Sequence, residues 1–296
     1  MSQRPIAIHV VTLMPDLVRS AVAHGVIGQA LKDGVWQLDL VNPREFTSDV
    51  HHTVDDRVFG GSDGMLMLAE TLARSVEKVR TRAVPLRVIH LSPRGRKFDD
   101  RLARDLAQTL AAGDTELVLI ASRYAGVDER FIEEFCDDEV SVGDYVVSGG
   151  ELPAAIMIDA ILRHVPGVLG NQASSENDSF SNGLLESAQY TRPREWRGRD
   201  VPTALLSGDP AVIDDWKFAE GLRTTLERRP DLLSASSVAE RDSIVEKLLA
   251  IEQRAHKAVK ASKSASVKAS AAQEILVLLD QVKVQLSRLV QTKEPS

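Results

Sequence analysis

Four glycine-rich segments follow short apolar runs, and they are the parts of the sequence best suited to hold a small ligand. They are FGGSDGM (59–65), LSPRG (91–95), SRYAG (122–126) and SVGDYVVSGGE (141–151). Glycine adopts positive φ and lets backbone N–H and C=O groups approach a ligand closely, although tight turns alone would also need it. Because ligands of open α/β sheets usually bind at turns of this kind, the four segments together favour a nucleoside-type pocket.

Two charged residues near these segments could serve catalysis. Asp178 lies in the polar stretch ENDSF, where a carboxylate could act as a general base, although a loop carboxylate is more often a turn former. Arg163 lies among apolar residues on a helix predicted at 151–165. A cation buried there would need a partner or a ligand, unless it extends to solvent at the helix end. Neither residue decides a function alone.

Several common cofactor motifs are absent from the sequence. No G-x-G-x-x-G follows the first predicted strand, and there is no G-x-x-x-x-G-K-[ST] or G-x-S-x-G. These absences disfavour a dinucleotide-binding fold, a P-loop protein and an α/β-hydrolase. The seven histidines show no spacing typical of metal ligands. We therefore predict no metal site from the residues themselves.

The first half of the chain alternates strand and helix patterns. Short runs rich in Ile and Val predict buried strands at 6–13, 86–92 and 116–122. Apolar residues at helical spacing predict helices, with Asp99 or Asp100 as a possible N-cap of the second, at 69–80, 99–111 and 151–165. Strands alternating with helices indicate an α/β fold with a mostly parallel sheet.

The second half has a different organisation. The segment 171–182 has almost no apolar content and predicts a long exposed loop that holds the domain boundary. Helices are expected at 212–229 and 236–253, followed at 257–272 by a Lys/Ala/Ser-rich segment that is a flexible linker or a weak helix. One amphipathic face follows, and it could pack on the helix at 236–253 or on a partner chain. Its residues are Ile275, Leu279, Val282, Leu286 and Leu289.

The composition is that of a soluble globular protein, with 43% hydrophobic and 27% charged residues. No apolar run is long enough to span a bilayer, and the N-terminal sequence lacks a signal-peptide cleavage pattern. Cys136 is the only cysteine, which fits a reducing compartment. We therefore expect a cytoplasmic location.

The net charge of −7 argues mildly against a nucleic-acid partner. Phosphate contacts depend on local clusters more than on the sum. Arginine and lysine gather at 94–97, 192–199 and 223–229. Each cluster alone would be an ordinary solvated face, so charge leaves the partner open.

Eight longer motifs follow one another along the chain. They are VDDRVFGGSDGMLM (54–67), LSPRGRKF (91–98), RYAGVDERF (123–131), SVGDYVVSGGELPA (141–154), PGVLGN (166–171), DSFSNGLLE (178–186), YTRP (190–193) and VPTALLSGD (201–209). Taken in this order, they closely resemble the motifs of the bacterial tRNA (guanine-N1)-methyltransferase family of the SPOUT superfamily. The similarity extends from about residue 5 to about residue 235.

The resemblance implies an S-adenosylmethionine-binding α/β domain at 1–170 with a deep trefoil knot. It further implies a flexible loop at 171–185, a helical tRNA-binding domain at 186–253 and an additional extension at 254–296. Family members are homodimers with the active site at the subunit interface. The residues that the resemblance assigns to the methyl donor are Leu91, Pro93, Ser122, Tyr124, Val142, Tyr145, Val147, Gly149 and Gly150.

For catalysis, the resemblance makes Asp178 the general base that removes the N1 proton of guanosine 37 in tRNA. Arg163 matches an arginine that stabilises charge developing on the guanine. In the family, the loop with the aspartate comes from the partner subunit and orders over the site when tRNA binds. Magnesium is a possible cofactor by the same resemblance.

Several positions depart from the family pattern, and the tail beyond about residue 250 is longer than usual. The family usually reads Cys-Gly-Arg-Tyr-Glu-Gly where this chain has Ser122 and Ala125 in place of the glycine and the glutamate. Pro210 stands where a histidine is usual. These changes raise the alternative of a catalytically impaired tRNA-binding homologue, and a knotted methyltransferase for another RNA is a third reading. Because Asp178 and Arg163 are both retained, we favour the active enzyme.

Overall fold

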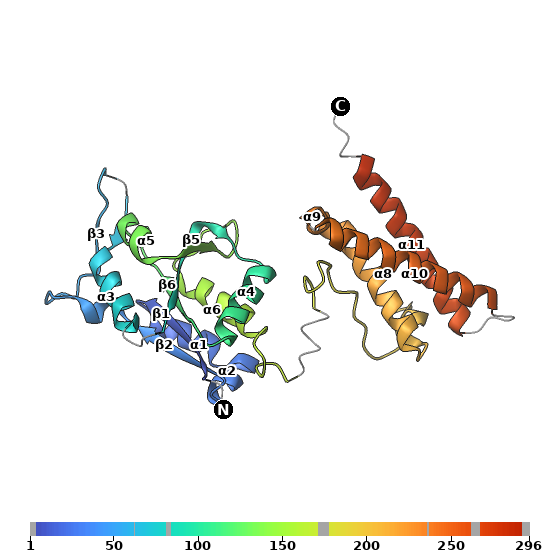
Figure 1. Ribbon diagram of the computed structural model, residues 1–296, viewed down its shortest axis with the longest axis horizontal. Helices are drawn as coiled ribbons and strands as arrows, with labels where there is room; N and C mark the ends of the chain where they lie inside the picture. Colours follow the sequence, from blue (N-terminus) through green and yellow to red (C-terminus); the bar gives the residue numbers. More distant parts are fainter. Residues whose placement is uncertain are drawn as a thin grey trace. The chain divides into compact units, whose positions relative to one another are not determined.

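The computed structural model describes residues 4–61, 63–80, 84–170, 178–235, 237–261 and 267–291. The chain divides into two units, Met1–Ser175 and Glu176–Ser296 (Figure 1). Residues 171–177 of the polar loop expected from the sequence lie outside the described residues.

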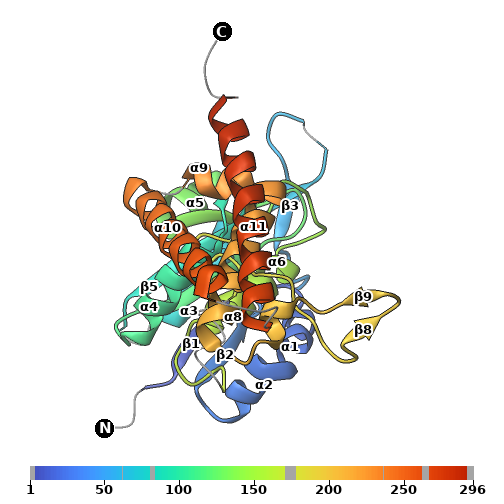
Figure 2. The same cartoon turned by 90° about the vertical axis from the view of Figure 1, so that its right-hand side faces the viewer.

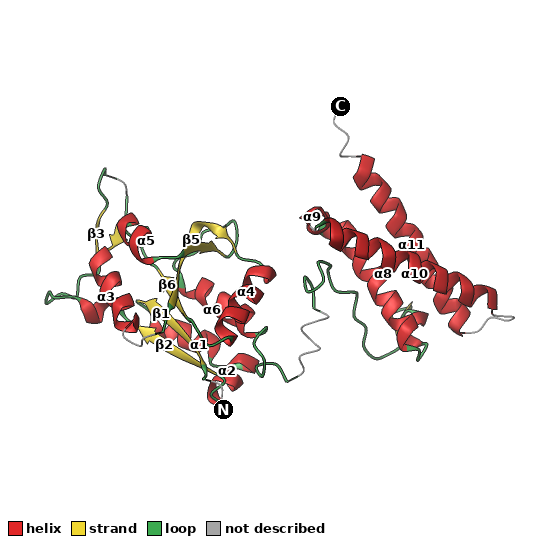
Figure 3. Ribbon diagram, in the orientation of Figure 1, coloured by secondary structure: helices red, strands yellow, loops and turns green. Residues whose placement is uncertain are grey.

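Short apolar runs form the central sheet of the first unit (Figure 3). Its neighbouring strands are all parallel and follow the order β2-β1-β6-β5-β7. They are β1 (Ile6–Thr12), β2 (Trp36–Val41), β5 (Leu86–Lys97), β6 (Glu116–Ala121) and β7 (Asp138–Ser141). The predicted mostly parallel α/β sheet is confirmed. The apolar pattern does not reveal β2 and β7, because these two edge strands are half polar.

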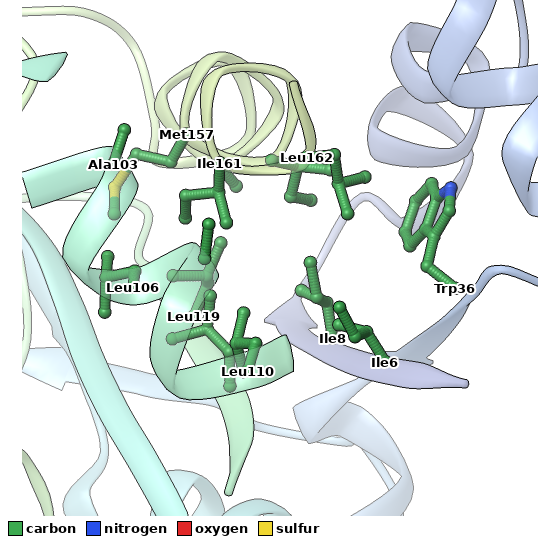
Figure 4. Packing of buried hydrophobic residues seen from close by; sticks show 14 of the residues in the cluster. Ile6, Ile8, Trp36, Ala103, Leu106, Leu110, Leu119, Met157, Ile161 and Leu162 are labelled. Atoms are coloured by element: carbon green, nitrogen blue, oxygen red, sulfur yellow. The ribbon is translucent and has the colours of Figure 1, made fainter. Parts of the chain in front are cut away.

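Alternate residues of the strands pack into two cores, as the period of two in a strand requires. Ile8 and Leu119 pack into the core with α1 (Pro15–Val22), α2 (Gly25–Lys32), α4 (Asp100–Ala111) and α6 (Glu151–Leu162) (Figure 4). Val118 and Ile120 pack into the other core with α3 (Ala69–Arg80) and α5 (Glu129–Phe135). The sheet therefore has helices on both faces, and the loops lie at the ends of its strands.

Two predicted helix boundaries bear on the candidate residues. The carboxylate of Asp99 caps α4 by accepting from the backbone N–H of Leu102 at 2.9 Å. α6 ends at Leu162, three residues earlier than predicted, and Arg163 is its exposed C-cap. The idea that Arg163 is buried among apolar residues is therefore wrong, because the last turn gives way before Pro166 and directs this side chain to solvent.

Small elements complete the first unit. A 3-10 helix, η1 (Pro43–Phe46), follows β2, and β3 (Asp55–Arg57) pairs with β4 (Met65–Met67) in an antiparallel ribbon. Met67 of β4 is fully buried in the second of the two cores. This ribbon supports the segment 122–126, because Ala125 N donates to Met65 O at 2.8 Å.

The second unit is mostly helical (Figure 2). Its elements are a short hairpin, β8 (Glu195–Trp196) and β9 (Arg199–Asp200), the 3-10 helix η2 (Thr203–Leu206), α8 (Pro210–Arg228), α9 (Pro230–Ala235), α10 (Val238–Ala261) and α11 (Val267–Gln291). α10 continues through KAVKA, a part of the expected linker whose alanine and lysine residues favour a helix. No helix in the described parts of the chain is both long and apolar enough to cross a membrane.

α11 packs within its own unit, against α8, α10 and η2. Ile275, Leu279 and Val282 of the predicted amphipathic face are all at most 3% exposed. Glu274 accepts from the backbone N–H groups of Thr203 and Ala204, both at 3.0 Å, and so caps η2. Of the two sequence-based alternatives, packing on a neighbouring helix of the same chain is the one observed.

Candidate active site

Three of the four glycine-rich segments close around one cavity of about 380 Å³ in the first unit. They are 91–95, which lies within β5 where its pairing with β7 shifts register, 122–126, which directly follows β6, and 141–151, which begins at the last residue of β7. All the residues that the sequence analysis assigns to a methyl donor line this cavity. They are Leu91, Pro93, Ser122, Tyr124, Val142, Tyr145, Val147, Gly149 and Gly150. The fourth segment, 59–65, does not line the cavity with any of its described residues. Its Met65 carbonyl accepts a hydrogen bond from Ala125 N and so supports the second segment.

The order of the strands brings these segments together. β5 lies between β6 and β7, so the carboxyl ends of three parallel strands meet at one edge of the sheet. Gly150 N donates to Ser122 O at 2.8 Å, which joins the third segment to the second. Phe98 N donates to Ser141 O at 2.8 Å, which joins the third segment to the residues that follow the first segment. Backbone bonds therefore hold the cavity's walls together.

Two glycines permit this close approach. A Cβ atom on Gly150 would lie 2.6 Å from the Cα of Ala121. A Cβ atom on Gly149 would lie 2.5 Å from Nε of Arg123 and 2.6 Å from Oε2 of Glu151. A side chain at position 150 would force the third segment away from the backbone of the second, and one at position 149 would displace the side chains of Arg123 and Glu151.

A buried carboxylate ties the cavity to the core. Glu151, 1% exposed, is the first residue of α6, and its Oε2 lies 2.9 Å from Nε of Arg123. Thr12, at the end of β1, donates its hydroxyl proton to Oε1 of Glu151 at 2.9 Å. Nη1 of Arg123 also donates to Ser148 O at 3.3 Å. The ion pair and the hydrogen bond from Thr12 thus join β1, the second segment and α6, which begins at the end of the third segment.

A polar chain also borders the cavity. Nε2 of His90 lies 3.1 Å from Oγ of Ser122, and Nδ1 lies 2.9 Å from Oε1 of Glu139. Burial lowers the pKa of His90, whereas the hydrogen bond and charge of Glu139 oppose that change. The sequence analysis did not single out His90 or Glu139. The only available signal is that a histidine near the end of a predicted strand directly precedes the LSPRG turn.

Aromatic and aliphatic side chains at the cavity's mouth are exposed. Tyr124 is 49% exposed, Tyr145 is 54% exposed and Val147 is 39% exposed. Tyr124 adopts a positive φ of 61°, which a residue with a Cβ atom rarely does and which directs the turn of the second segment. Apolar groups in such positions gain stabilisation when a ligand removes their surface from water.

The catalytic candidates lie elsewhere. Arg163 is at the opposite end of α6 from the cavity and does not line it. Asp178 belongs to the second unit, where it lines another cavity of about 380 Å³ together with Lys217 and Lys247. Its backbone carbonyl accepts from the backbone N–H of Ser181 at 3.2 Å. Across the described residues, no group of three or more His, Cys, Asp or Glu side chains is arranged to hold a metal ion.

Comparison with known proteins identifies the family. Residues 6–235 match the family model described as tRNA (Guanine-1)-methyltransferase TrmD. A protein named tRNA (guanine-N(1)-)-methyltransferase from Shewanella oneidensis is 48% identical over 235 residues, 79% of this chain and 93% of that protein. One of the same name from Neisseria meningitidis serogroup C is 43% identical over 248 residues, 83% of this chain and 98% of that protein. The chain belongs to the tRNA (guanine-N1)-methyltransferase family.

The cavity lies entirely within the matched part of this methyltransferase. The family resemblance inferred from the eight motifs is therefore confirmed. α10 and α11 begin at Val238 and Val267 and lie beyond the matched residues.

The structure accounts for two of the departures from the methyltransferase pattern. Pro210 is the first residue of α8, a position at which its fixed φ and missing N–H cost nothing, and Asp209 caps the same helix. Ser122 uses its hydroxyl to contact His90. The methyl group of Ala125 would lie 3.2 Å from a Cβ atom placed on Gly64, and nothing among the described residues explains the loss of the glutamate that is usual at this position.

Proposed function

We propose that the protein transfers a methyl group from S-adenosylmethionine to N1 of guanosine 37 in tRNA, next to the anticodon. The observation that carries the proposal is that the three segments matched to methyl-donor loops form the walls of one cavity. The three segments are far apart in the sequence. The fold brings them together, so their shared position at one cavity supports the proposal independently of the similarity of each motif.

The cavity suits S-adenosylmethionine in size and chemistry. Its volume of about 380 Å³ is within the range of small-molecule sites. Gly149 and Gly150 leave their backbone groups accessible at a wall where a side chain would not fit, and Leu91, Val142 and Tyr145 offer apolar surface. When bound, S-adenosylmethionine supplies an electrophilic methyl group on a positively charged sulfur.

In this proposal Asp178 and Arg163 act on the guanine. The N1 atom of guanine is a poor nucleophile until its proton leaves, so Asp178 accepts that proton and frees the lone pair for methyl transfer. Arg163 stabilises the negative charge that develops toward O6. Arg163 is exposed and Asp178 is only partly buried, so a substrate can reach both side chains.

The proposal includes a trefoil knot in the first unit. A Cβ atom on Gly95 would lie 2.3 Å from Val140 N, so the segment 91–97 packs directly on β7. From β7, at the edge of the sheet, the chain returns through 142–150 to α6, which packs on β1 and β6 at its centre. A return path beside such a closely packed loop supports a knotted course of the chain.

We further propose a homodimer in which Asp178 of one subunit serves the cavity of the other. Large apolar side chains are exposed on neighbouring elements of the first unit, namely Met14 and Leu17 at α1 and Leu152 and Ile156 on α6. Leu152 and Ile156 are four residues apart and share one helix face. Exposed apolar surface of this kind is typical of a subunit interface.

The β8–β9 hairpin is a candidate contact for tRNA. Every residue of 191–200 is exposed, which includes four arginines of the basic cluster identified in the sequence. The guanidinium carbon of Arg197 lies 4.8 Å from the ring centre of Trp196, which is 57% exposed. Cations beside an exposed indole can pair with phosphates while the ring stacks on a base.

Methyl transfer from labelled S-adenosylmethionine to an unmodified tRNA transcript tests the function, with Asp178→Ala and Arg163→Ala as variants. We expect the wild type to label the tRNA. Asp178→Ala should lower the rate by about a hundredfold or more, because a positioned general base contributes roughly 10²- to 10⁴-fold. Binding of tRNA and S-adenosylmethionine without transfer by the wild type would favour the catalytically impaired homologue, with Ser122 and Ala125 as its altered residues.

A further inference from the structure

His90 lies on β5, between the last residues of β6 and the first residues of β7. It is 3% exposed. The parallel register places it directly beside Glu139 on β7. Ser122 is the first residue after β6, and its hydroxyl lies 3.1 Å from Nε2 of His90. Both His90 and Ser122 line the cavity, whereas Glu139 stands behind His90 and away from it.

The partners fix the positions of the protons. An ionised carboxylate only accepts hydrogen bonds, so Nδ1 of His90 must carry a proton and donate to Glu139. In the neutral ring, Nε2 then has a lone pair and accepts from the Ser122 hydroxyl. The only proton of that hydroxyl is thus committed to His90, and the oxygen can offer the cavity lone pairs alone.

We propose that Ser122, oriented by His90 and Glu139, is a specificity-determining group that accepts a hydrogen bond from an amino or hydroxyl donor of the bound nucleoside. This inference rests on the proposed function, because it takes the nucleoside to be S-adenosylmethionine or its demethylated product. Ser122 is the contacting residue, and His90 and Glu139 are positioning residues. The family pattern has glycine at position 122, so the contact distinguishes this chain from that pattern.

The arrangement makes ligand binding depend on pH. Once His90 is protonated, Nε2 donates to one lone pair of the Ser122 oxygen, and the hydroxyl proton is released toward the cavity. The oxygen then has one lone pair left and its own proton faces the ligand's donor, so the contact weakens. The protein binds the nucleoside best when His90 is neutral. Its affinity therefore has its full value above the pKa of His90 and falls as the pH decreases through that value. Because burial lowers this pKa below its usual 6.5, the decline is expected in mildly acidic solution.

The other charges around His90 come from two elements. Arg94, on β5, lies 3.9 Å from the Oε2 atom of Glu139 and forms an ion pair with Glu129 of α5 at 2.8 Å. The charge of Arg94 lowers the pKa of His90, and that of Glu129 raises it. These two groups pair with each other, so Glu139 is the carboxylate that sets the orientation of the ring.

The test measures the dissociation constant of S-adenosylhomocysteine by calorimetry for the wild type and Ser122→Gly, from about pH 8 down to the lowest pH at which the protein stays folded. For the wild type we expect binding to weaken severalfold on acidification. Ser122→Gly removes one hydrogen bond, so it should bind about three- to tenfold more weakly at about pH 8 and show no change with pH.

His90→Gln and His164→Gln are a matched pair of histidine variants. His164 is also partly buried and paired with a carboxylate, that of Asp100 at 3.0 Å, but it does not line the cavity. His90→Gln should abolish the pH dependence, and His164→Gln should preserve it. This readout separates orientation of the hydroxyl from a general loss of structure, which would not remove a pH dependence selectively.

Two results would overturn the inference while leaving the proposed function intact. A wild-type dissociation constant that does not vary with pH would show that the proton on His90 has no influence on the ligand. A Ser122→Gly variant that keeps both the wild-type affinity and its pH dependence would show that the hydroxyl makes no contact. If instead the wild type bound no S-adenosylhomocysteine at any pH, the assignment of the methyl donor itself would fail, and this inference with it.

Discussion

Glu151 is the residue on which the geometry of the cavity most depends. It is 1% exposed and forms an ion pair with Arg123 at 2.9 Å. Breaking a buried ion pair by removing one partner leaves the other charge uncompensated. We therefore expect Glu151→Ala to lower the free energy of unfolding by about 3 kcal/mol and to weaken S-adenosylhomocysteine binding, as measured by urea unfolding and calorimetry.

Glu70 provides the control for that substitution. Its side chain is 71% exposed and pairs with Arg74 at 2.7 Å on one helix face. Exposed pairs of this kind contribute little, so Glu70→Ala should change stability by less than about 0.5 kcal/mol. Equal losses for the two variants would contradict a special role for Glu151.

Cys136 should be chemically inert. Burial, with the nearby charges of Glu139 and Asp137, raises the pKa of its thiol to about 12. Only the thiolate reacts with iodoacetamide, so we expect alkylation at about pH 8 to be roughly a thousandfold slower than for an unshifted cysteine. Mass spectrometry of the folded protein checks this, with the urea-unfolded protein as reference. Similar rates in both states would contradict the burial of this thiol.

The residues of the cavity were predictable to different extents. Gly149 and Gly150 could be identified because glycine pairs after apolar runs are visible in the sequence alone. His90 and Glu139 could not, because they are neighbours only through the register of β5 and β7, and β7 carries no clear strand pattern. For Arg163, the sequence placed the helix end too late.

Among the elements, α11 has the clearest energetic role. It lies beyond the residues matched to the methyltransferase family, yet Ile275 and Leu279 are 3% and 2% exposed. Leu279→Ala should lower the free energy of unfolding of the second unit by about 2–5 kcal/mol. Val267→Ala, at a position that is 55% exposed, should have an effect near zero.

Truncation after Ala261 extends this test. Removing α11 takes away the cap that Glu274 provides for η2 and the apolar cover of α8. We expect the truncated protein to lose the cooperative unfolding of its second unit in circular dichroism. Its first unit should still bind S-adenosylhomocysteine, because the cavity draws only on that unit. Full tRNA methylation by the truncated protein would contradict a structural role of α11.

Elements with a single clear pattern were predictable, and elements that depend on context were not. β1 and β6 are buried along their whole length, so their apolar runs identify them. The face of α11 was also visible, but its partner was not, because spacing identifies an apolar face and not the surface that covers it. α10 is longer than predicted. Its last residues, KAVKA, have a low-complexity composition, but alanine and lysine both favour a helix.

At the scale of the whole molecule, the exposed face of α6 predicts association. Leu152 and Ile156 are each 49% exposed. A charge at either position would be desolvated in an interface, so Leu152→Asp and Ile156→Asp should shift the protein from dimer to monomer in analytical ultracentrifugation. Val238→Asp, a change at a 66% exposed position in the second unit, is the control. A monomeric wild type would contradict the proposed dimer.

A measurement of where the methyl group is placed tests the central claim most directly. The substrates are a tRNA transcript with guanosine at positions 36 and 37 and a matched transcript with adenosine at position 37. We predict 1-methylguanosine at position 37 of the first transcript only, in nuclease digests analysed by mass spectrometry, and none with Asp178→Ala. Methylation of the adenosine transcript, transfer to another atom of guanine, or an undiminished product from Asp178→Ala would contradict the account.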